Sequence, residues 1–141
     1  MADPRLAVAY GGIGARFATF KIDNSTITYL ATADGGSSQV GLAVTLSAAD
    51  TVALVADAGA VLGKLIHVES DNTCTVQIAG AMTLPAGTGA SLTPGKAIVG
   101  CLLVAARGYI REVNTAVAAE LGVCRGVILD ADTTTAVELV L

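Results

Sequence analysis

Alternation of apolar and polar positions is the clearest pattern in this chain. Over residues 73–79, the side chains of Cys74, Val76 and Ile78 point to one face of an extended segment, and the intervening polar side chains point to the other. A period of two residues is typical of a half-buried β-strand. Residues 65–69 alternate in the same way, and the turn-forming Ser-Asp-Asn between the two segments predicts a hairpin.

Turn signals recur along the rest of the chain. Clusters of Gly, Pro, Asp, Asn and Ser occur at 34–36, 57–59, 70–72, 85–87, 94–95 and 130–132. The short β-branched stretches between them predict an all-β fold, a small β-barrel or a sandwich, and not an α/β fold. Residues 97–106 are apolar on both faces, as in a central or an interface strand. Residues 135–141 alternate loosely and are expected to close the sheet.

At most one short helix is expected. Residues 114–121 begin with an asparagine suited to an N-cap, continue with an alanine-rich body and are followed by Gly122, and this combination predicts a helix. Residues 47–50 have the spacing of a capping box, but residues 51–55 fit a strand equally well, so both structures stay open there.

The first 20 residues show little periodicity and include the glycine-rich stretch 11–14. We therefore expect an extended N-terminal arm over residues 1–20, followed by a β-rich domain over residues 21–141. Stretched out, 20 residues reach at most about 70 Å. Ordering such an arm costs much entropy, so it is expected to be fixed only by a partner, the alternative being a frayed terminus. The candidate contact residues are Arg5, Leu6, Tyr10, Arg16 and Phe17.

Composition narrows the classes of partner. Of the 141 residues, 53% are hydrophobic and 14% are charged, and the net charge is −4. A typical chain has about 25% charged residues, and a surface that binds nucleic acid needs excess positive charge, so we expect no nucleic-acid partner. The longest apolar run, residues 97–106, has about half the roughly 20 residues of a membrane span, and the N-terminal run at residues 6–9 is too short for the core of a signal peptide. We expect a soluble chain, made in the cytoplasm, that covers its apolar surface by forming an oligomer.

The cysteines and the single histidine do not suggest a metal site. Cys74, Cys101 and Cys124 are widely spaced, form no Cys-x-x-Cys pair, and are expected to be free thiols that pack as small hydrophobic side chains. His67 falls on the mixed, more solvated face of its strand, where a surface position is expected.

Catalytic motifs are also missing. Residues 11–14 have no preceding strand and no following Lys-Ser/Thr, so they do not form a phosphate loop. Asp130 and Asp132, with Glu138 nearby, fit a solvated turn better than a pair of acid–base catalysts. No Gly-x-Ser-x-Gly motif occurs. We expect no catalytic residue, metal or cofactor.

A set of turn-and-strand motifs extends over residues 60–141. The motifs are Thr-Val-Gln-Ile-Ala-Gly at 75–80, Thr-Leu-Pro-Ala-Gly at 83–87, Leu-Thr-Pro-Gly-Lys at 92–96, Ala-Ile-Val-Gly at 97–100, Arg-Gly-Val-Ile-Leu at 125–129 and Val-Glu-Leu-Val-Leu at 137–141. Together they resemble the small capsid cement (decoration) proteins of tailed bacteriophages.

This resemblance implies a structural protein on the outer surface of the virion. Such a protein binds the outer face of the phage head and stabilises contacts between subunits of the major capsid protein. It further implies a homo-oligomer, a trimer or alternatively a dimer, and we place the subunit interface on the uncharged strand 97–106. The candidate interface residues are Ile98, Val99, Leu102 and Leu103.

Two functions from other classes stay open. The first is a small β module on the virion surface that binds a receptor or a glycan. Such sites usually need exposed aromatic side chains, and the tyrosines of this chain are Tyr10, Tyr29 and Tyr109. The second is a trimeric phage enzyme, which the missing motifs disfavour.

Overall fold

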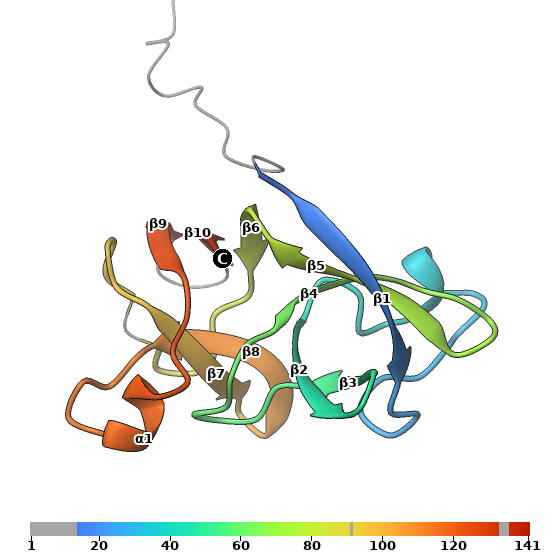
Figure 1. Cartoon of the computed structure of the whole chain (residues 1–141), viewed down its shortest axis with the longest axis horizontal. Coiled ribbons are helices and arrows are strands. Elements are labelled where there is room, and N and C mark those ends of the chain that lie inside the picture. The colour runs from blue at the N-terminus through green and yellow to red at the C-terminus, as the bar shows by residue number, and fades with distance from the viewer. Residues whose placement is uncertain (1–13, 91, 133–135) are drawn as a thin grey trace, which may run out of the picture.

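The structure, a computed structural model, describes residues 14–90, 92–132 and 136–141, which form a mostly β fold (Figure 1). The strands are β1 (Arg16–Ile22), β2 (Ala43–Ala48), β3 (Thr51–Leu54), β4 (Gly63–Val68), β5 (Thr73–Ala79), β6 (Ala81–Leu84), β7 (Ile98–Leu103), β8 (Ala106–Glu112), β9 (Val127–Asp132) and β10 (Ala136–Val140). A short 3₁₀ helix, η2 (Asp34–Gly36), precedes β2, and the four-residue helix α1 (Ala118–Leu121) precedes β9. The all-β prediction with one short α-helix is confirmed for these residues.

The first five strands close into a barrel in the order β1-β3-β2-β4-β5. β1 completes the closure, since it pairs with β5 in antiparallel and with β3 in parallel orientation. Of the two predicted architectures, the chain thus adopts the barrel. The side chains inside it that have no exposed surface are aliphatic and help to fill the narrow interior that a five-stranded barrel encloses. They are Ile27, Val44, Val52, Leu65 and Val76.

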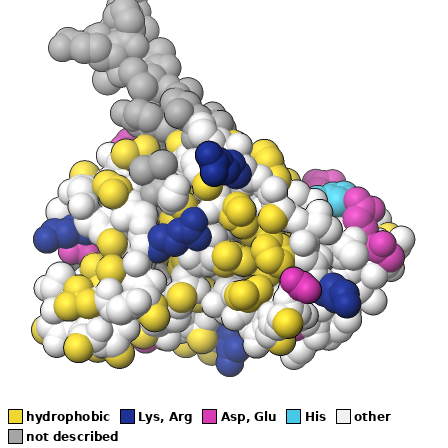
Figure 2. Space-filling view, viewed as in Figure 1, with side chains coloured by type: hydrophobic (Ala, Val, Ile, Leu, Met, Phe, Trp, Pro, Cys, Tyr) yellow, Lys and Arg dark blue, Asp and Glu magenta, His cyan; other side chains and the backbone are white. Residues whose placement is uncertain are grey.

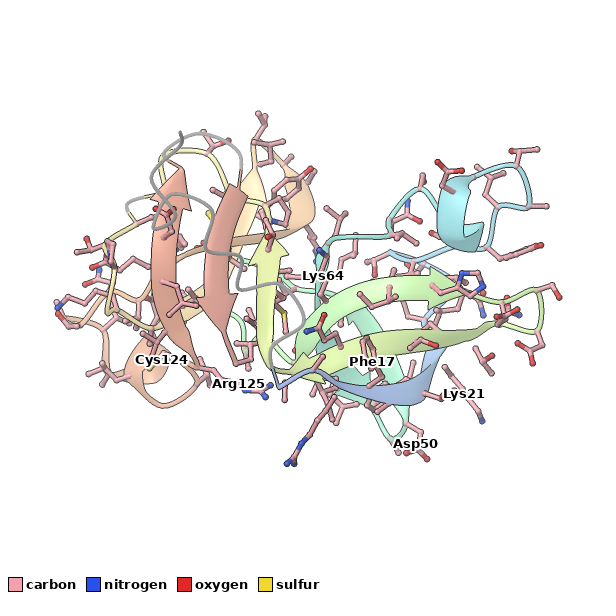
Figure 3. The ribbon with its side chains drawn as sticks, turned by 90° about the horizontal axis from the view of Figure 1, so that it is seen from above. Phe17, Lys21, Asp50, Lys64, Cys124 and Arg125 are labelled. Atoms are coloured by element: carbon pink, nitrogen blue, oxygen red, sulfur yellow. The ribbon has the colours of Figure 1, made fainter. Side chains whose placement is uncertain are left out.

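The remaining strands pack beside the barrel around a second core. They form a three-stranded sheet, β6-β10-β9, and the β7–β8 hairpin. Figures 1 and 3 show these strands next to the barrel. Ala43, Val55 and Val61 belong to the barrel half of the chain but contribute their side chains to the second core, together with Ile98 and Ile110. The predicted β-rich domain therefore contains two cores, and the second core includes residues from the barrel half of the chain.

Arg125 connects the two parts. Its backbone pairs with Ile98 of β7, while its guanidinium reaches the barrel. Nη1 donates to the carbonyl of Leu62 (2.6 Å) and Nη2 donates to the carbonyl of Ile78 (2.5 Å). Hydrogen bonds from a charged donor are stronger than those between neutral groups. One side chain thus fixes the segment before β9 against β5 and against the loop that leads into β4.

The predicted strand over residues 73–79 is confirmed, with the same bounds, as β5, and the hairpin with β4 forms as expected. One side chain of its polar face differs from the prediction. Gln77 is buried, and its Nε2 donates to the carbonyls of Ala79 and Ala81. The polar face is covered here because β1 and β6 both come close to this end of β5. Farther upstream, residues 51–54 form β3, which settles the open choice there in favour of a strand.

The predicted arm over residues 1–20 is too long at its C-terminal end. Residues 16–20 belong to β1, where Ala18, Phe20 and Ile22 turn toward the barrel interior. This period of two is present in the sequence, but it follows directly after the glycine-rich stretch. Arg16 and Phe17 are therefore residues of a barrel strand, and residues 1–13 lie outside the described residues.

The apolar segment 97–106 is not one strand. It contains β7, a turn at 104–105 and the first residue of β8, with Leu103 paired to Ala106. No Gly, Pro or Asn marks this turn, so the run of apolar residues conceals it. Val104 instead takes the left-handed conformation, at φ 59°.

The predicted helix over residues 114–121 is shorter than expected. Asn114 Oδ1 accepts a hydrogen bond from the backbone N–H of Ala116, which produces a turn before the helix. Val117, with an extended φ of −108°, stands at the N-cap, and Gly122 ends the helix in a right-handed conformation. No helix in the described part of the chain is long and apolar enough to cross a membrane.

Candidate interaction surface

The predicted subunit contacts of β7 divide into buried and exposed residues. Ile98 and Val99 are fully buried within the chain itself, so the folded chain does not present them to another subunit. Their prediction as interface residues is wrong because β7 is covered on both faces by its own chain. Leu102 is half-buried and Leu103 is 41% exposed, at the end of the β7–β8 hairpin.

The tip of this hairpin carries an exposed apolar side chain on a strained backbone. Val104 is 85% exposed and has a φ of 59°. A β-branched residue rarely adopts a positive φ, since its Cβ substituents crowd the backbone. Such outliers persist where the surrounding structure holds them, and they cluster at functional sites.

The segment 87–88 holds the hairpin tip in place. The N–H of Val104 donates to Thr88 Oγ1 (2.7 Å), and the N–H of Thr88 donates to the carbonyl of Leu102 (2.9 Å). Gly87 lies so close to β7 that a Cβ there would be 2.4 Å from Cys101 Sγ. These contacts hold the base of the hairpin tip against the segment 87–88.

A second apolar protrusion surrounds α1. Val117, Leu121 and Val123 are exposed, and residues 115–123 present no charged side chain to solvent, because Glu120 is buried. Figure 1 shows α1 and the β7–β8 turn along the lower edge of the molecule, on the side opposite to the start of β1. We refer to these exposed side chains together as the apolar edge. It comprises Leu103, Val104, Val117, Leu121 and Val123.

A buried ion pair fixes the α1 protrusion to β8. Glu120 Oε1 accepts from Arg111 Nη2 (2.5 Å), and Glu120 Oε2 accepts from Arg111 Nη1 (2.9 Å) and from the backbone N–H of Asn114 (2.8 Å). These hydrogen bonds from Arg111 and Asn114 lower the pKa of Glu120 to about 2. The same carboxylate, helped by Asp57 (3.1 Å from Nε), raises the pKa of Arg111 above its usual value. The protrusion is thus held in one position by a charged network.

Phe17 marks a separate apolar area on the barrel. It is 56% exposed and stands on the outer face of β1, opposite Gln77 of β5. Figure 2 shows hydrophobic side chains gathered in the middle of the face that β1 crosses, and Figure 3 shows Phe17 and Arg125 on that same side. Of the predicted arm contacts, Arg16 and Phe17 are exposed here, whereas Arg5, Leu6 and Tyr10 lie outside the described residues.

The histidine and cysteines have structural positions. His67 is partly exposed, as predicted, and its Nε2 lies 2.9 Å from Glu69 Oε1. Cys74 and Cys101 are buried free thiols whose pKa values are raised by burial, while the free Cys124 is half-buried. In the part of the chain that the structure describes, no three His, Cys, Asp or Glu side chains group together as metal ligands would.

Sequence reasoning did not find the apolar edge beyond Leu103. Val104 stands inside an apolar run without a turn residue, and Val117 to Val123 resembles an ordinary amphipathic helix end. The partners Arg111 and Glu120 come from different elements, so no local spacing relates them. Comparisons of the chain with protein-family models, with curated proteins and with solved structures found no match.

Proposed function

We propose that this chain is a capsid cement (decoration) protein of a tailed bacteriophage. In this role it binds the outer surface of the head and stabilises contacts between major capsid protein subunits. Two lines of reasoning support the proposal. One is the resemblance of the motifs in residues 60–141, and the other is the apolar edge. The protein performs no reaction in this role.

The apolar edge is the observation that carries the proposal. Each of its two protrusions exposes apolar side chains, as protein–protein contact sites often do. Here the side chains stand on two protrusions, of which Thr88 fixes one and the Arg111–Glu120 pair fixes the other. A contact surface that is rigid before binding loses little conformational entropy when it binds. Each contact is small, but an array of many copies on a shell can stabilise it strongly.

The proposal includes self-association as a trimer, with a dimer as the alternative. Closed cyclic symmetry lets identical subunits cover the same surface on every copy. With Ile98 and Val99 inside the chain, the proposal places the subunit contacts on the exposed apolar groups around Phe17 and at the apolar edge. A measurement of mass in solution at micromolar concentration decides between these states, and a stable monomer contradicts the proposed oligomer.

Binding to phage heads tests the function directly. Purified full-length protein is mixed with heads that lack it, and co-sedimentation and electron microscopy report its occupancy on the outer surface. We expect saturable binding of the wild-type chain and at least a tenfold weaker affinity for Val104→Asp and Leu121→Asp. The matched control is Leu30→Asp, because Leu30 is 47% exposed, close to the 49% of Leu121, but lies before η2. Absence of wild-type binding, or virions without the protein, overturns the proposal.

A further inference from the structure

A groove separates the barrel from strand β8. It has a volume of about 340 Å³, enough for two or three side chains. Two leucines from the barrel half, Leu42 and Leu54, line it, and β8 contributes Arg107 and Tyr109. Leu54 is buried and Leu42 is half-buried, whereas Arg107 is exposed. The groove therefore combines an aliphatic lining with a positive charge at its rim.

Gly108 creates this arrangement. Its N–H donates to the carbonyl of Val55 (2.9 Å), and a Cβ at this position would lie 2.9 Å from Leu42 Cβ and 3.2 Å from Leu54 Cδ2. The φ of 97° also favours glycine here. Because β8 can approach the leucines so closely, Arg107 and Tyr109, on either side of Gly108, both border the groove.

The polar groups around the groove differ in whether they already form hydrogen bonds within the chain. Gln39 Oε1 accepts from Ser37 Oγ (2.7 Å) and from the N–H of Thr28 (3.3 Å). Thr26 Oγ1 accepts from the N–H of Leu54 (2.8 Å). By contrast, the guanidinium of Arg107 has no hydrogen bond or salt bridge within the residues that the structure describes. The N–H donors of the Arg107 guanidinium are therefore available to a bound group.

We propose that this groove is a docking site for an extended acidic peptide segment. A carboxylate of the segment pairs with Arg107, whose planar fork suits carboxylates, and a neighbouring aliphatic side chain packs on Leu42 and Leu54. The charge of Arg107 and the aliphatic lining favour such a segment over a sugar, since a sugar needs many free polar partners. This assignment rests on the proposed function, according to which the segment belongs to the major capsid protein.

Peptide titration of the isotope-labelled full-length protein, followed by NMR, tests this site. The probes are acetyl-Leu-Glu-Leu-amide and its neutral match, acetyl-Leu-Gln-Leu-amide. We expect the acidic peptide to shift the backbone amides of residues 106–109 and to bind at least fivefold more tightly than the neutral one. Arg107→Gln should remove this difference, whereas Arg16→Gln, an exposed arginine at the start of β1, should retain it.

Several outcomes overturn the inference. Equal affinity for the two peptides, or the same preference in Arg107→Gln, contradicts the role of the guanidinium. Tighter binding of galacturonic acid at the same amides identifies a glycan site instead. Head binding is measured separately, so the two proposals can fail independently. If the wild-type protein does not bind heads but distinguishes the two peptides, the groove inference stands and the cement function fails. If it binds heads but does not distinguish the two peptides, only the groove inference fails.

Discussion

Replacement of Val104 by glycine should stabilise the fold while weakening head binding. Val104 has a φ of 59° and is 85% exposed, so the substitution removes backbone strain and almost no buried surface. The N–H that donates to Thr88 Oγ1 is retained in glycine. Mutations that relieve strain at a contact site typically gain stability and lose function.

The magnitude follows from two opposing effects. A left-handed conformation costs an L-residue about 1–2 kcal/mol, and more for a β-branched side chain. Glycine reduces this gain by about 0.5–1 kcal/mol, because it loses more backbone entropy on folding than other residues do. The net gain is about 1 kcal/mol. At about 2.1 cal/mol/K of unfolding entropy per residue, a chain of 141 residues gains about 3 °C in Tm.

Thermal unfolding followed by calorimetry and circular dichroism measures this gain. The matched control is Val127→Gly, because Val127 is also an exposed valine but lies in strand β9 without a positive φ. Without strain to relieve, this control should lose about 0.5–1 kcal/mol. If Val104→Gly lowers Tm as the control does, the hairpin tip is not strained and the reasoning is refuted.

Four further predictions concern the core, the ion pair, the thiols and the N-terminal segment. Ile110→Ala leaves a cavity in the second core and should cost about 2–5 kcal/mol in urea denaturation, and a loss below 1 kcal/mol contradicts the packing. Glu120 has a pKa of about 2, below the usual 4.5, so it stabilises the fold above pH 4.5 and loses this effect as the pH falls toward 2. Glu120→Gln should therefore have a lower urea midpoint than wild type at pH 7 and a similar one near pH 2, and a constant difference would falsify this account. At pH 8, a thiol reagent should modify the half-buried Cys124 before Cys74, whose burial raises its pKa, as mass spectrometry can show. Deletion of residues 2–13 leaves β1 intact, so it should preserve the circular dichroism spectrum and reduce head occupancy, and unchanged occupancy argues against a gripping arm.

Those parts of the fold that depend on local alternation could be predicted from the sequence. β5 and its hairpin with β4 have a clear period of two, and the predicted bounds of β5 agree with the structure. β1 has the same period, but the glycines before it dominate the local pattern, which favours an arm over a strand. The β7–β8 turn could not be found, since Val104 takes a conformation that its own propensity disfavours.

The candidate site depends on contacts between distant segments, which a single sequence does not reveal. Glu120 has an ordinary surface position in a helical pattern, and only the approach of β8 places Arg111 against it. Likewise Gly108 looks like a plain strand glycine until Leu42 and Leu54 are seen to pack on it. Ile98 and Val99 were misassigned because apolar residues at a subunit interface and in a core have the same sequence pattern.

The contribution of residues 43–61 to the second core implies an order of assembly during synthesis. The barrel strands occupy the continuous stretch 16–79, so the barrel can close on the ribosome before the later strands emerge. The second core needs Ala43, Val55 and Val61, which that barrel already holds in position. The newly made C-terminal half therefore folds onto a finished template, and a fragment that begins at β6 lacks part of its own interior.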